Sequence, residues 1–424
     1  MAPRDIYPDG RYWLGLRTVV DECSLDARSV EGEDFVAVFS AQPFRNPFYD
    51  SMILTTRSMD RPRICFVVNS AYETSVPADI ATALVKYTDC IVDVLAWFDA
   101  DSFEGDDLVG VRCLDAPDTA LGADRGTLAE ARDVVESYDL VQAHHNHSGG
   151  FAKLLARLAG VPTVSREGNL RRGFTRKGRV FNGLTNALAA RVVPNSVAVR
   201  DDFRRWERLL LPENRVRIIP NGVDTDRLAA GESLDWSVRE ARGIGPETVL
   251  VSNAALLTEQ KAHDVLIRAL GAARTDERVE LAVAGDSPLN PRLRSLAERE
   301  RVTDWVHLLG RIDRERVYRL IHESDVYAMP SRWEGFSAAA VEAMGLGSAC
   351  VFSDIEPFRE PYDDVALFHP VDDADELADR LVMLAERPDL RDDLASAGRE
   401  LVETQYTMES VARQYRGLYA EILG

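Results

Sequence analysis

The sequence predicts an α/β protein made of two successive domains, each a parallel sheet covered by helices on both faces. Past residue 62, short apolar runs alternate with segments of helical periodicity, the pattern of parallel strands buried on both faces. The 424 residues, 46% of them hydrophobic, suffice for two full-sized cores. Pro220 and Gly222 interrupt the pattern once, near residues 218–224. We therefore expect two facing Rossmann-like domains with the active site in the cleft between them.

The first domain is expected at residues 63–219, after an N-terminal extension, residues 1–62, that we leave unassigned. Its strands are expected at 63–68, 90–97, 139–143, 161–165, 191–194 and 215–219. Helices are expected between them at 79–86, 150–158 and 197–210. The extension contains apolar runs of its own, at 12–20 and 35–39, which favour an ordered segment.

The second domain is expected at residues 220–407, followed by a last helix within residues 408–424. Its strands are expected at 249–255, 279–284, 305–309, 326–329, 349–353 and 365–368. Neither a repeat of solenoid period nor a low-complexity tract interrupts this alternation.

The charge composition is unusual. The net charge is −20, with 40 Asp and 46 Arg but only four Lys: Lys86, Lys153, Lys177 and Lys261. Such acidity argues against nucleic acid as a partner. An acidic chain with Arg in place of Lys is typical of salt-loving organisms, in which high ionic strength screens self-repulsion. A GC-rich genome is the alternative explanation.

Cysteine usage and hydropathy favour a cytoplasmic protein. The five cysteines form no Cys-x-x-Cys pair, and three lie in apolar runs, so buried reduced thiols are expected. No stretch of 18 apolar residues occurs, and the N-terminus does not read as a signal peptide. Any membrane contact is therefore expected to be peripheral, at the inner face.

Residues 324–354 carry the most informative motif. An apolar strand ends before Pro330, a loop carries Glu334, and an Ala-rich helix at 337–344 carries Glu342. A strand that leads through a tight loop into a helix N-terminus offers backbone amides to a phosphate. A carboxylate on that helix can accept hydrogen bonds from vicinal hydroxyls, such as those of a ribose.

This stretch resembles the donor-site signature of retaining GT-B glycosyltransferases of family four, in which two glutamates flank a Glu-Gly-Phe-Gly turn. The resemblance implies that Glu334 contacts the donor sugar and Glu342 the ribose. It implies backbone N–H donors at Gly335, Phe336 and Ser337, although Ser337 replaces the second glycine of the family. It covers residues 135–424 well and 63–134 weakly, and it implies that the last helix crosses back onto the first domain.

The resemblance also supplies a positive charge for the leaving diphosphate. Lys261 lies at a strand–loop–helix junction, where the family places a diphosphate-binding lysine. The arginine that often precedes it by five residues is Leu256 here. Arg311 occupies the loop that lies against the nucleobase in the family. Asp-x-Asp triplets occur at 99–101, 224–226 and 373–375, no more often than about four expected by chance, so we expect no metal or other cofactor.

The acceptor side departs from the family. Residues 69–74 replace its glycine-rich loop, and Arg166 stands where a histidine is often found. A family histidine that faces the donor sugar corresponds to His144, with His145 as the second choice. Residues 171–179 form a basic-aromatic patch for an acceptor phosphate or anionic lipid, with a solvated loop as the alternative reading. Its members of interest are Arg171, Arg172, Phe174 and Arg176.

The resulting hypothesis is a glycosyltransferase that moves a hexose-type sugar from a nucleotide diphosphate with retention of configuration. Lys261, Glu334 and His144 are the expected catalytic residues. The acceptor would be a glycan, a lipid-phosphate-linked glycan at the membrane surface or a small molecule. Two alternatives remain: a nucleotide-sugar epimerase of the same fold, and a non-catalytic scaffold, suggested by the missing glycine loop and by Leu256.

Overall fold

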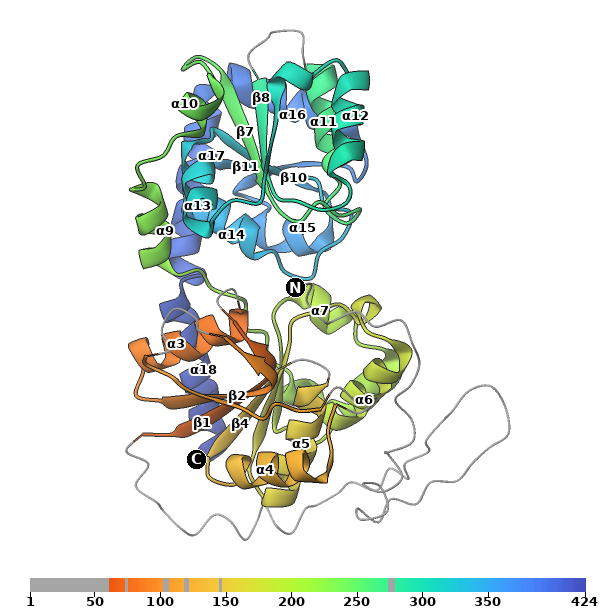
Figure 1. Cartoon of the computed structure of the whole chain (residues 1–424), viewed down its shortest axis with the longest axis vertical. Helices are drawn as coiled ribbons and strands as arrows, with labels where there is room; N and C mark the ends of the chain where they lie inside the picture. Colours follow the sequence, from red (N-terminus) through yellow and green to blue (C-terminus); the bar gives the residue numbers. More distant parts are fainter. Residues whose placement is uncertain (1–60, 73–74, 102–106, 118–121, 145–146, 274–278) are drawn as a thin grey trace, which may run out of the picture.

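A computed structural model of the chain describes residues 61–72, 75–101, 107–117, 122–144, 147–273 and 279–424. Two α/β domains follow one another along the long axis of the molecule (Figure 1). Residues 1–60 of the N-terminal extension lie outside the described residues, and so does His145.

The first domain alternates strands and helices through residue 210. Its elements are β1 (Arg63–Ala71), α3 (Val76–Tyr87), β2 (Ile91–Ala100), β3 (Gly110–Cys113), α4 (Arg125–Val135), β4 (Leu140–His144), α5 (Ser148–Ala159), β5 (Thr163–Glu167), the 3₁₀ turn η1 (Arg171–Gly173), α6 (Arg176–Asn186), β6 (Arg191–Pro194), α7 (Val197–Asp201) and α8 (Arg205–Leu210). The six strands are parallel in the order β3-β2-β1-β4-β5-β6.

The second domain repeats the plan. Its elements are α9 (Thr225–Glu232), α10 (Val238–Arg242), β7 (Val249–Ala254), α11 (His263–Ala273), β8 (Val279–Ala284), α12 (Asn290–Arg299), η4 (Thr303–Trp305), β9 (Val306–Gly310), α13 (Arg314–Glu323), β10 (Val326–Met329), α14 (Ala338–Gly345), β11 (Ala349–Ser353), α15 (Glu356–Tyr362), β12 (Ala366–His369), α16 (Ala374–Glu386) and α17 (Pro388–Gln405). Its parallel strands run in the order β12-β11-β10-β7-β8-β9.

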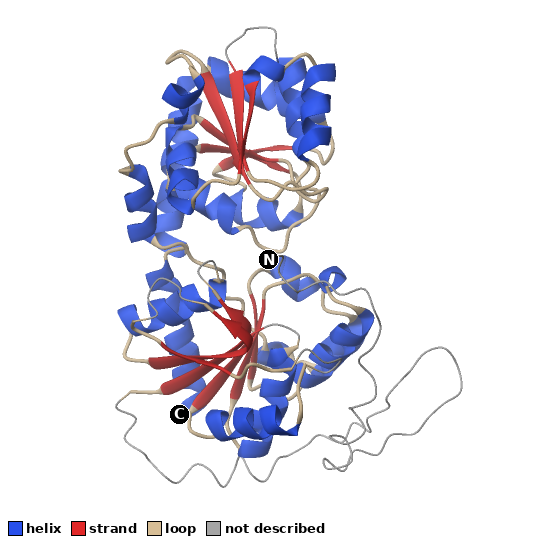
Figure 2. Ribbon diagram, viewed as in Figure 1, coloured by secondary structure: helices blue, strands red, loops and turns tan. Residues whose placement is uncertain are grey.

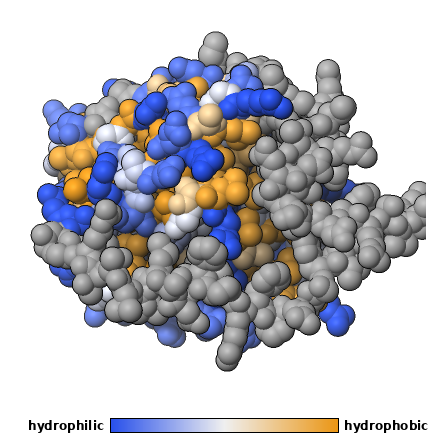
Figure 3. All heavy atoms as spheres, turned by 90° about the horizontal axis from the view of Figure 1, so that it is seen from below, coloured by the Kyte–Doolittle hydropathy of each residue, from blue (hydrophilic) through white to orange (hydrophobic). Residues whose placement is uncertain are grey.

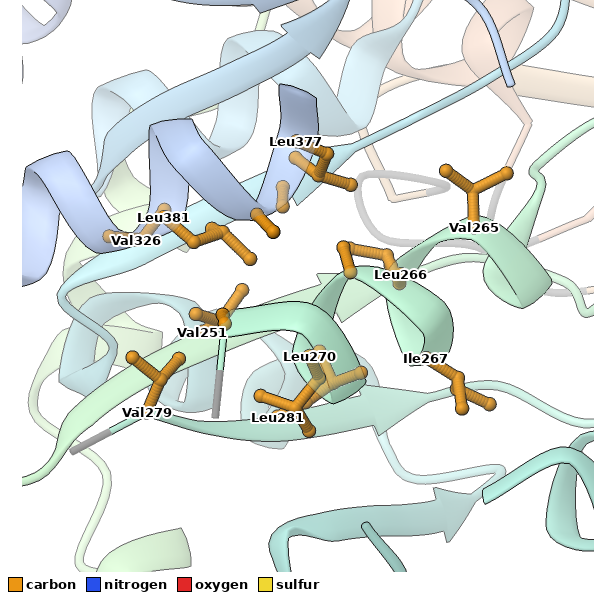
Figure 4. Close-up of a cluster of buried hydrophobic side chains, with 14 of the residues drawn as sticks. Val251, Val265, Leu266, Ile267, Leu270, Val279, Leu281, Val326, Leu377 and Leu381 are labelled. Atoms are coloured by element: carbon orange, nitrogen blue, oxygen red, sulfur yellow. The ribbon is translucent and has the colours of Figure 1, made fainter. Parts of the chain in front are cut away.

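Helices cover both faces of each sheet, which gives three layers per domain (Figure 2). In the second domain, Val251 and Leu281 of the sheet meet Leu266 and Leu270 of α11 in one buried cluster, which Leu377 of α16 completes (Figure 4). Seen from below, the first domain shows apolar and hydrophilic side chains interspersed on the surface that is not grey (Figure 3). The prediction of two doubly wound α/β domains is confirmed.

The chain passes between the domains twice, at adjacent positions. The first passage follows η2 (Glu213–Arg215), and the second leads from α17 into α18 (Met408–Leu423). Val223 donates its backbone N–H to Tyr406 O at 2.8 Å, and Met408 N donates to Val223 O at 2.9 Å, so the two passages pair. Helix α18 then packs with α3 in the core of the first domain, beside Phe66 and Ile80.

The six strands expected in the second domain all form, within one residue at either end. The strand expected at 215–219 is wrong: this segment makes an isolated bridge, Val192 to Val216, and then leaves for the second domain. The sixth strand is instead β3, at the opposite edge of the sheet beside β2, whose residues are mostly exposed and therefore carry no apolar run. The expected helix at 197–210 is two short helices, because Arg204 between them has an extended backbone.

Among the described residues, no helix is long and apolar enough to cross a membrane.

Candidate functional site

Two loops at the carboxyl ends of β7 and β10 meet in a close ion pair. The ammonium Nζ of Lys261 lies 2.6 Å from Oε1 of Glu334. The amide of Gln260 donates to Oε2 of the same carboxylate at 3.2 Å and to Trp333 O at 2.9 Å. The side chain of Glu334 is 6% exposed and that of Lys261 is 20% exposed. The first signature glutamate and the lysine thus form one unit, which long-range folding brings together across 73 residues.

The loop that carries Glu334 is fixed by Arg332. Its guanidinium contacts Asp264 at 3.1 Å and Asp372 at 2.7 Å, and its backbone N–H donates to Gln260 O at 2.8 Å. These bonds tie the Glu334 loop to the start of α11 and to the loop after β12. The position of Glu334 is therefore set by the second domain itself.

Ser337 is accommodated without strain where the family has glycine. Its backbone is extended, with φ −104°, so no left-handed conformation is required at this position. Its hydroxyl accepts from Ala340 N at 3.3 Å and caps the N-terminus of α14. Phe336 packs against Tyr406, with ring centroids 6.2 Å apart, so its ring belongs to the core of the second domain.

Glu342 lies on α14 and contacts a second helix. Tyr318 of α13 donates its hydroxyl to Oε1 of Glu342 at 3.0 Å, and Arg314 lies 3.7 Å from the same oxygen. Burial raises the pKa of Glu342, while Arg314 and the hydrogen bond from Tyr318 oppose that rise. The side chain remains 16% exposed. The carboxylate of Glu342 is thus fixed by α13 and has limited access to solvent.

The two domains meet both at the loop that carries Glu334 and close to Glu342. At the Glu334 end, Ser196 donates its hydroxyl to Gly335 O at 2.7 Å, and the guanidinium of Arg172 lies 5.0 Å from the ring centroid of Trp333. A Cβ added to Gly335 would lie 3.3 Å from Val199 of α7, so glycine permits this close approach.

At the Glu342 end, the contact is an ion pair between the domains. Arg227 of α9 lies 3.0 Å from Asp79 of α3, and both side chains are about 10% exposed. Arg227 lowers the pKa of Glu342 and Asp79 raises it, although burial is the larger effect on that carboxyl. Lys86 and Asp226, 2.6 Å apart, add an exposed pair between the same two helices.

Two further predicted donor residues lie at the carboxyl ends of neighbouring strands. Leu256, which replaces the family arginine, is 69% exposed in the loop after β7. Arg311 is exposed just after Gly310, whose φ of +70° turns the chain at the end of β9. Parallel strands bring these loops to the same edge of the sheet as Lys261 and Glu334.

Two sequence profiles divide the chain close to the point where the first domain ends. The profile of "Glycosyl transferases group 1" matches residues 236–401, and that of "Glycosyltransferase Family 4" matches residues 77–227. The chain is a group 1 glycosyltransferase of the GT-B type. The two matches cover the second and first domains respectively, so the signature residues described above lie in the group 1 region.

Relatives and solved structures agree with this assignment. The glycosyltransferase is 32% identical over 229 residues to the putative glycosyltransferase EpsF of Bacillus subtilis, covering 51% of the chain and 58% of that protein. It is 29% identical over 296 residues to the phosphatidyl-myo-inositol mannosyltransferase of Mycobacterium tuberculosis, covering 68% of the chain and 75% of that protein. The structure of Anabaena Alr3699/HepE in complex with UDP and glucose superimposes with a TM-score of 0.70 at 18% identity. That match covers 85% of this chain and all of that one.

His144 is not placed as expected. Its side chain is 1% exposed and lies against Phe66, with ring centroids 4.9 Å apart, and Nε2 is 3.2 Å from the amide of Gln142. Alternation along β4 points Gln142 and His144 to the face covered by α18, whose Tyr419 donates to Gln142. The imidazole thus packs in the core of the first domain in this conformation, and its catalytic role stays a prediction.

Arg171 is a second correction. It is fully buried and lies 2.7 Å from Glu167 and 2.9 Å from Glu207. Burial alone would raise the pKa of Glu167, but Arg171 and Lys153 lower it to about 2. Lys153 completes this buried network through Asn182, which accepts from Lys153 at 2.9 Å and donates to Glu167 at 2.9 Å. Arg171 therefore neutralises two buried carboxylates inside the first domain and cannot face a lipid or an acceptor.

The other patch residues stay near the surface. Arg172 and Arg176 are exposed, and Phe174 is half-buried with its ring against the guanidinium of Arg171 at 5.0 Å. Two of the three Asp-x-Asp triplets have a structural role, since Asp224 caps α9 and Asp373 caps α16. No cluster of three potential metal ligands occurs among the described residues.

A cavity of about 560 Å³ lies elsewhere, at the amino ends of the first-domain strands. Asp93, Gly110 and Tyr138 line it, each near the start of its strand. It thus lies in the first domain, away from the carboxyl ends of the strands of that sheet, and none of its lining residues belongs to the donor-side loops of the second domain.

Sequence reasoning missed four residues of the site: Tyr318, Arg314, Arg227 and Asp79. Arg314 and Tyr318 are four residues apart and so share a face of α13, but only the fold shows that this face meets Glu342. The pairing of Asp79 with Arg227 spans 148 residues and leaves no local signal.

Proposed function

We propose that the protein transfers a hexose-type sugar from a nucleotide diphosphate sugar to an acceptor, with retention of anomeric configuration. The observation that carries this proposal is the contact of Lys261 with Glu334, eight residues before Glu342 on the same strand–loop–helix unit. A cation such as Lys261 can bind a diphosphate, and a carboxylate can accept hydrogen bonds from the hydroxyls of a sugar or of a ribose. Lys261, Glu334 and Glu342 together offer these three groups. The UDP complex of the similar Anabaena protein supports a nucleotide as ligand.

Lys261 is proposed to bind the diphosphate of the donor. Its neighbour His263 accepts or donates at Nε2 with Asn253 at 2.9 Å, and burial lowers its pKa to about 4. The imidazole is therefore neutral near pH 7, and Lys261 provides the cationic charge at this junction. A diphosphate at Lys261 competes with Glu334 for the ammonium, so donor binding frees the Glu334 carboxylate to accept from a sugar hydroxyl.

Catalysis is proposed to rest on positioning and on electrostatic stabilisation of the leaving diphosphate. As the glycosidic bond breaks, negative charge accumulates on the phosphate oxygens, where Lys261 and the amides at the start of α11 can stabilise it. We assign no protein nucleophile, and the proposal needs no metal ion. Ser337 capping α14 leaves the backbone amides of Gly335 and Phe336 in the adjoining loop, next to Glu334.

A lipid-linked acceptor is proposed for the first domain. The similarity to a phosphatidyl-myo-inositol mannosyltransferase supports an acceptor with an anionic lipid headgroup. A basic surface with exposed apolar residues fits it: we define the α6–α8 surface as Arg176, Val180, Arg205, Arg208 and Leu209. Val180 is 47% exposed and Leu209 is 79% exposed. The three arginines make this surface basic, although the chain as a whole is acidic.

The two helices that carry the α6–α8 surface pack against each other. Helices α6 and α8 pack so closely at Gly183 that an added Cβ would lie 2.4 Å from Trp206. Helix α6 lies on the flank of the first domain opposite α3 (Figure 1). We infer a cytoplasmic protein that contacts the membrane peripherally through this surface. The 40 Asp and four Lys further support adaptation to high salt.

The proposed function is tested by exposing the protein to a panel of nucleotide sugars. Hydrolysis or transfer with one of them, together with a rise in melting temperature, is the expected result. Stabilisation by no nucleotide sugar would contradict the proposal.

A further inference from the structure

Tyr318 and Arg314, both on α13, fix the carboxylate of Glu342. Arg314 donates from Nε to the hydroxyl of Tyr318 at 2.8 Å, and that hydroxyl donates to Oε1 of Glu342 at 3.0 Å. The second guanidinium nitrogen of Arg314 approaches the same carboxylate oxygen at 3.7 Å. The three side chains form a directed chain of donors that ends on one oxygen of Glu342.

Tyr318 has little freedom to move. It is 2% exposed, and α9 approaches it so closely that a Cβ at Gly231 would lie 2.4 Å from the Cβ of Tyr318. Burial and the carboxylate of Glu342 raise the pKa of its phenol, so the hydroxyl keeps its proton and remains a donor near neutrality. A buried donor with one orientation fixes the rotamer of the carboxylate that accepts from it.

The other carboxylate oxygen is left for a ligand. Within the part of the chain that the structure describes, the bonds to the Glu342 side chain end on Oε1. A carboxylate can accept about four hydrogen bonds, and the side chain keeps 16% of its surface exposed. Oε2 can therefore accept from two vicinal hydroxyls while Oε1 is held by the protein.

We propose that Tyr318 and Arg314 are positioning residues for the nucleoside end of the donor, acting through Glu342. The inference rests on the proposed function, because it takes Glu342 as the acceptor for the ribose hydroxyls. The two residues have separate tasks. Tyr318 sets the direction of the carboxylate, and Arg314 orients Tyr318 and helps to keep the buried carboxylate ionised against the cost of burial.

The test is a double-mutant cycle read by calorimetry with nucleoside diphosphates, in wild type, Tyr318→Phe, Glu342→Gln and the double variant. Tyr318→Phe should weaken nucleotide binding roughly three- to tenfold, less than the loss of a direct hydrogen bond between ligand and charged group, because Tyr318 acts only through the carboxylate. In the Glu342→Gln background, the same change should have little further effect, since the residue acts through the carboxylate. The KM of the donor should rise with kcat nearly unchanged, because ribose contacts are equal in the ground and transition states.

Tyr362→Phe is the matched control. Tyr362 is a 1% exposed tyrosine of the same domain, and its hydroxyl has no hydrogen-bond partner among the described residues. Removing that hydroxyl should leave nucleotide affinity unchanged. The pH profile adds a second readout: loss of the Tyr318 bond raises the pKa of Glu342 further, so Tyr318→Phe should lose affinity at a higher pH than wild type as the solution is acidified.

Two results separate the inference from the proposed function. If Glu342→Gln weakens nucleotide binding while Tyr318→Phe does not, or if their effects simply add, the positioning role is overturned and the proposed function stands. If wild type binds no nucleoside diphosphate, the proposed function fails first, and the inference falls with it.

Discussion

Oε1 of Glu334 and Nζ of Lys261 form an ion pair at 2.6 Å, although both residues are proposed to bind the same donor. A carboxylate and an ammonium that are 6% and 20% exposed form a stronger pair than they would on the surface. A diphosphate must therefore displace Glu334 from the lysine before the lysine can serve the leaving group. Donor binding and the release of the sugar-binding carboxylate are one event in this account.

Glu334→Gln should bind a nucleoside diphosphate more tightly than wild type. The neutral amide no longer competes for Lys261, and a gain of about tenfold in affinity corresponds to about 1.4 kcal/mol. Transfer should nevertheless fall, because the amide is a weaker acceptor for a sugar hydroxyl. Calorimetry with the nucleotide and initial rates with the donor measure the two effects. Equal losses of nucleotide affinity and of transfer would show that Glu334 does not compete with the diphosphate.

Arg171→Ser should destabilise the protein, whereas Arg176→Ser should not. The first change leaves Glu167 and Glu207 as buried carboxylates without their cation, which costs about 3–5 kcal/mol of unfolding free energy. The second removes an exposed charge and should stay within about 0.5 kcal/mol. Denaturant titrations of both variants decide the matter. Equal stability of the two would mean that the buried network contributes nothing.

Glu167 should make the protein acid-sensitive. Its pKa is lowered to about 2 in the folded state from an ordinary value of 4.5. The stability it contributes is thus fully present above pH 4.5 and is lost as the pH falls toward 2; the shift corresponds to about 3 kcal/mol. Glu167→Gln should show a shallower loss of unfolding free energy than wild type between pH 5 and pH 3. Parallel curves for the two proteins would refute this role.

The α6–α8 surface should bind anionic vesicles. Changing Arg176, Arg205 and Arg208 together to Ser should reduce co-sedimentation with vesicles that contain acidic phospholipid, with donor hydrolysis unaffected, since each cation near such a surface contributes about 1 kcal/mol. The matched control changes three arginines on α12 to Ser: Arg292, Arg294 and Arg299. If both triple variants sediment like wild type, the surface is a solvated face of the protein.

The sequence was sufficient for much of the second domain, for a physical reason. Its central strands, such as β10 and β11, are buried on both faces and appear as uninterrupted apolar runs, and α14 is preceded by a serine that caps it. The edge strand β3 is mostly exposed, so it has no such run and was missed. The apolar run at 215–219 is not a strand: it makes one isolated bridge, Val192 to Val216, and Ile219 is apolar because it is buried in the core of the first domain.

The site was predictable only where it is local. Glu334, Glu342 and Lys261 lie on strand–loop–helix units that a short motif reveals. The environment of Arg171 was not predictable, because one of its carboxylates, Glu207, follows 36 positions later and a run of cations ordinarily indicates a solvated face. Burial of His144 depends on Phe66 and on α18, which returns from the far end of the chain.

The central claim is that Lys261 stabilises the leaving diphosphate, and Lys261→Ala tests it directly. Arg268→Ala is the control, since it removes a half-exposed cation from α11, the helix that follows Lys261, without touching Glu334. Turnover at saturating donor should fall by about 100- to 1,000-fold in Lys261→Ala, the loss typical of one transition-state donor, while the variant still folds, as judged by circular dichroism. Arg268→Ala should keep nearly full turnover. Near-normal turnover of a folded Lys261→Ala variant at saturating donor would contradict the account.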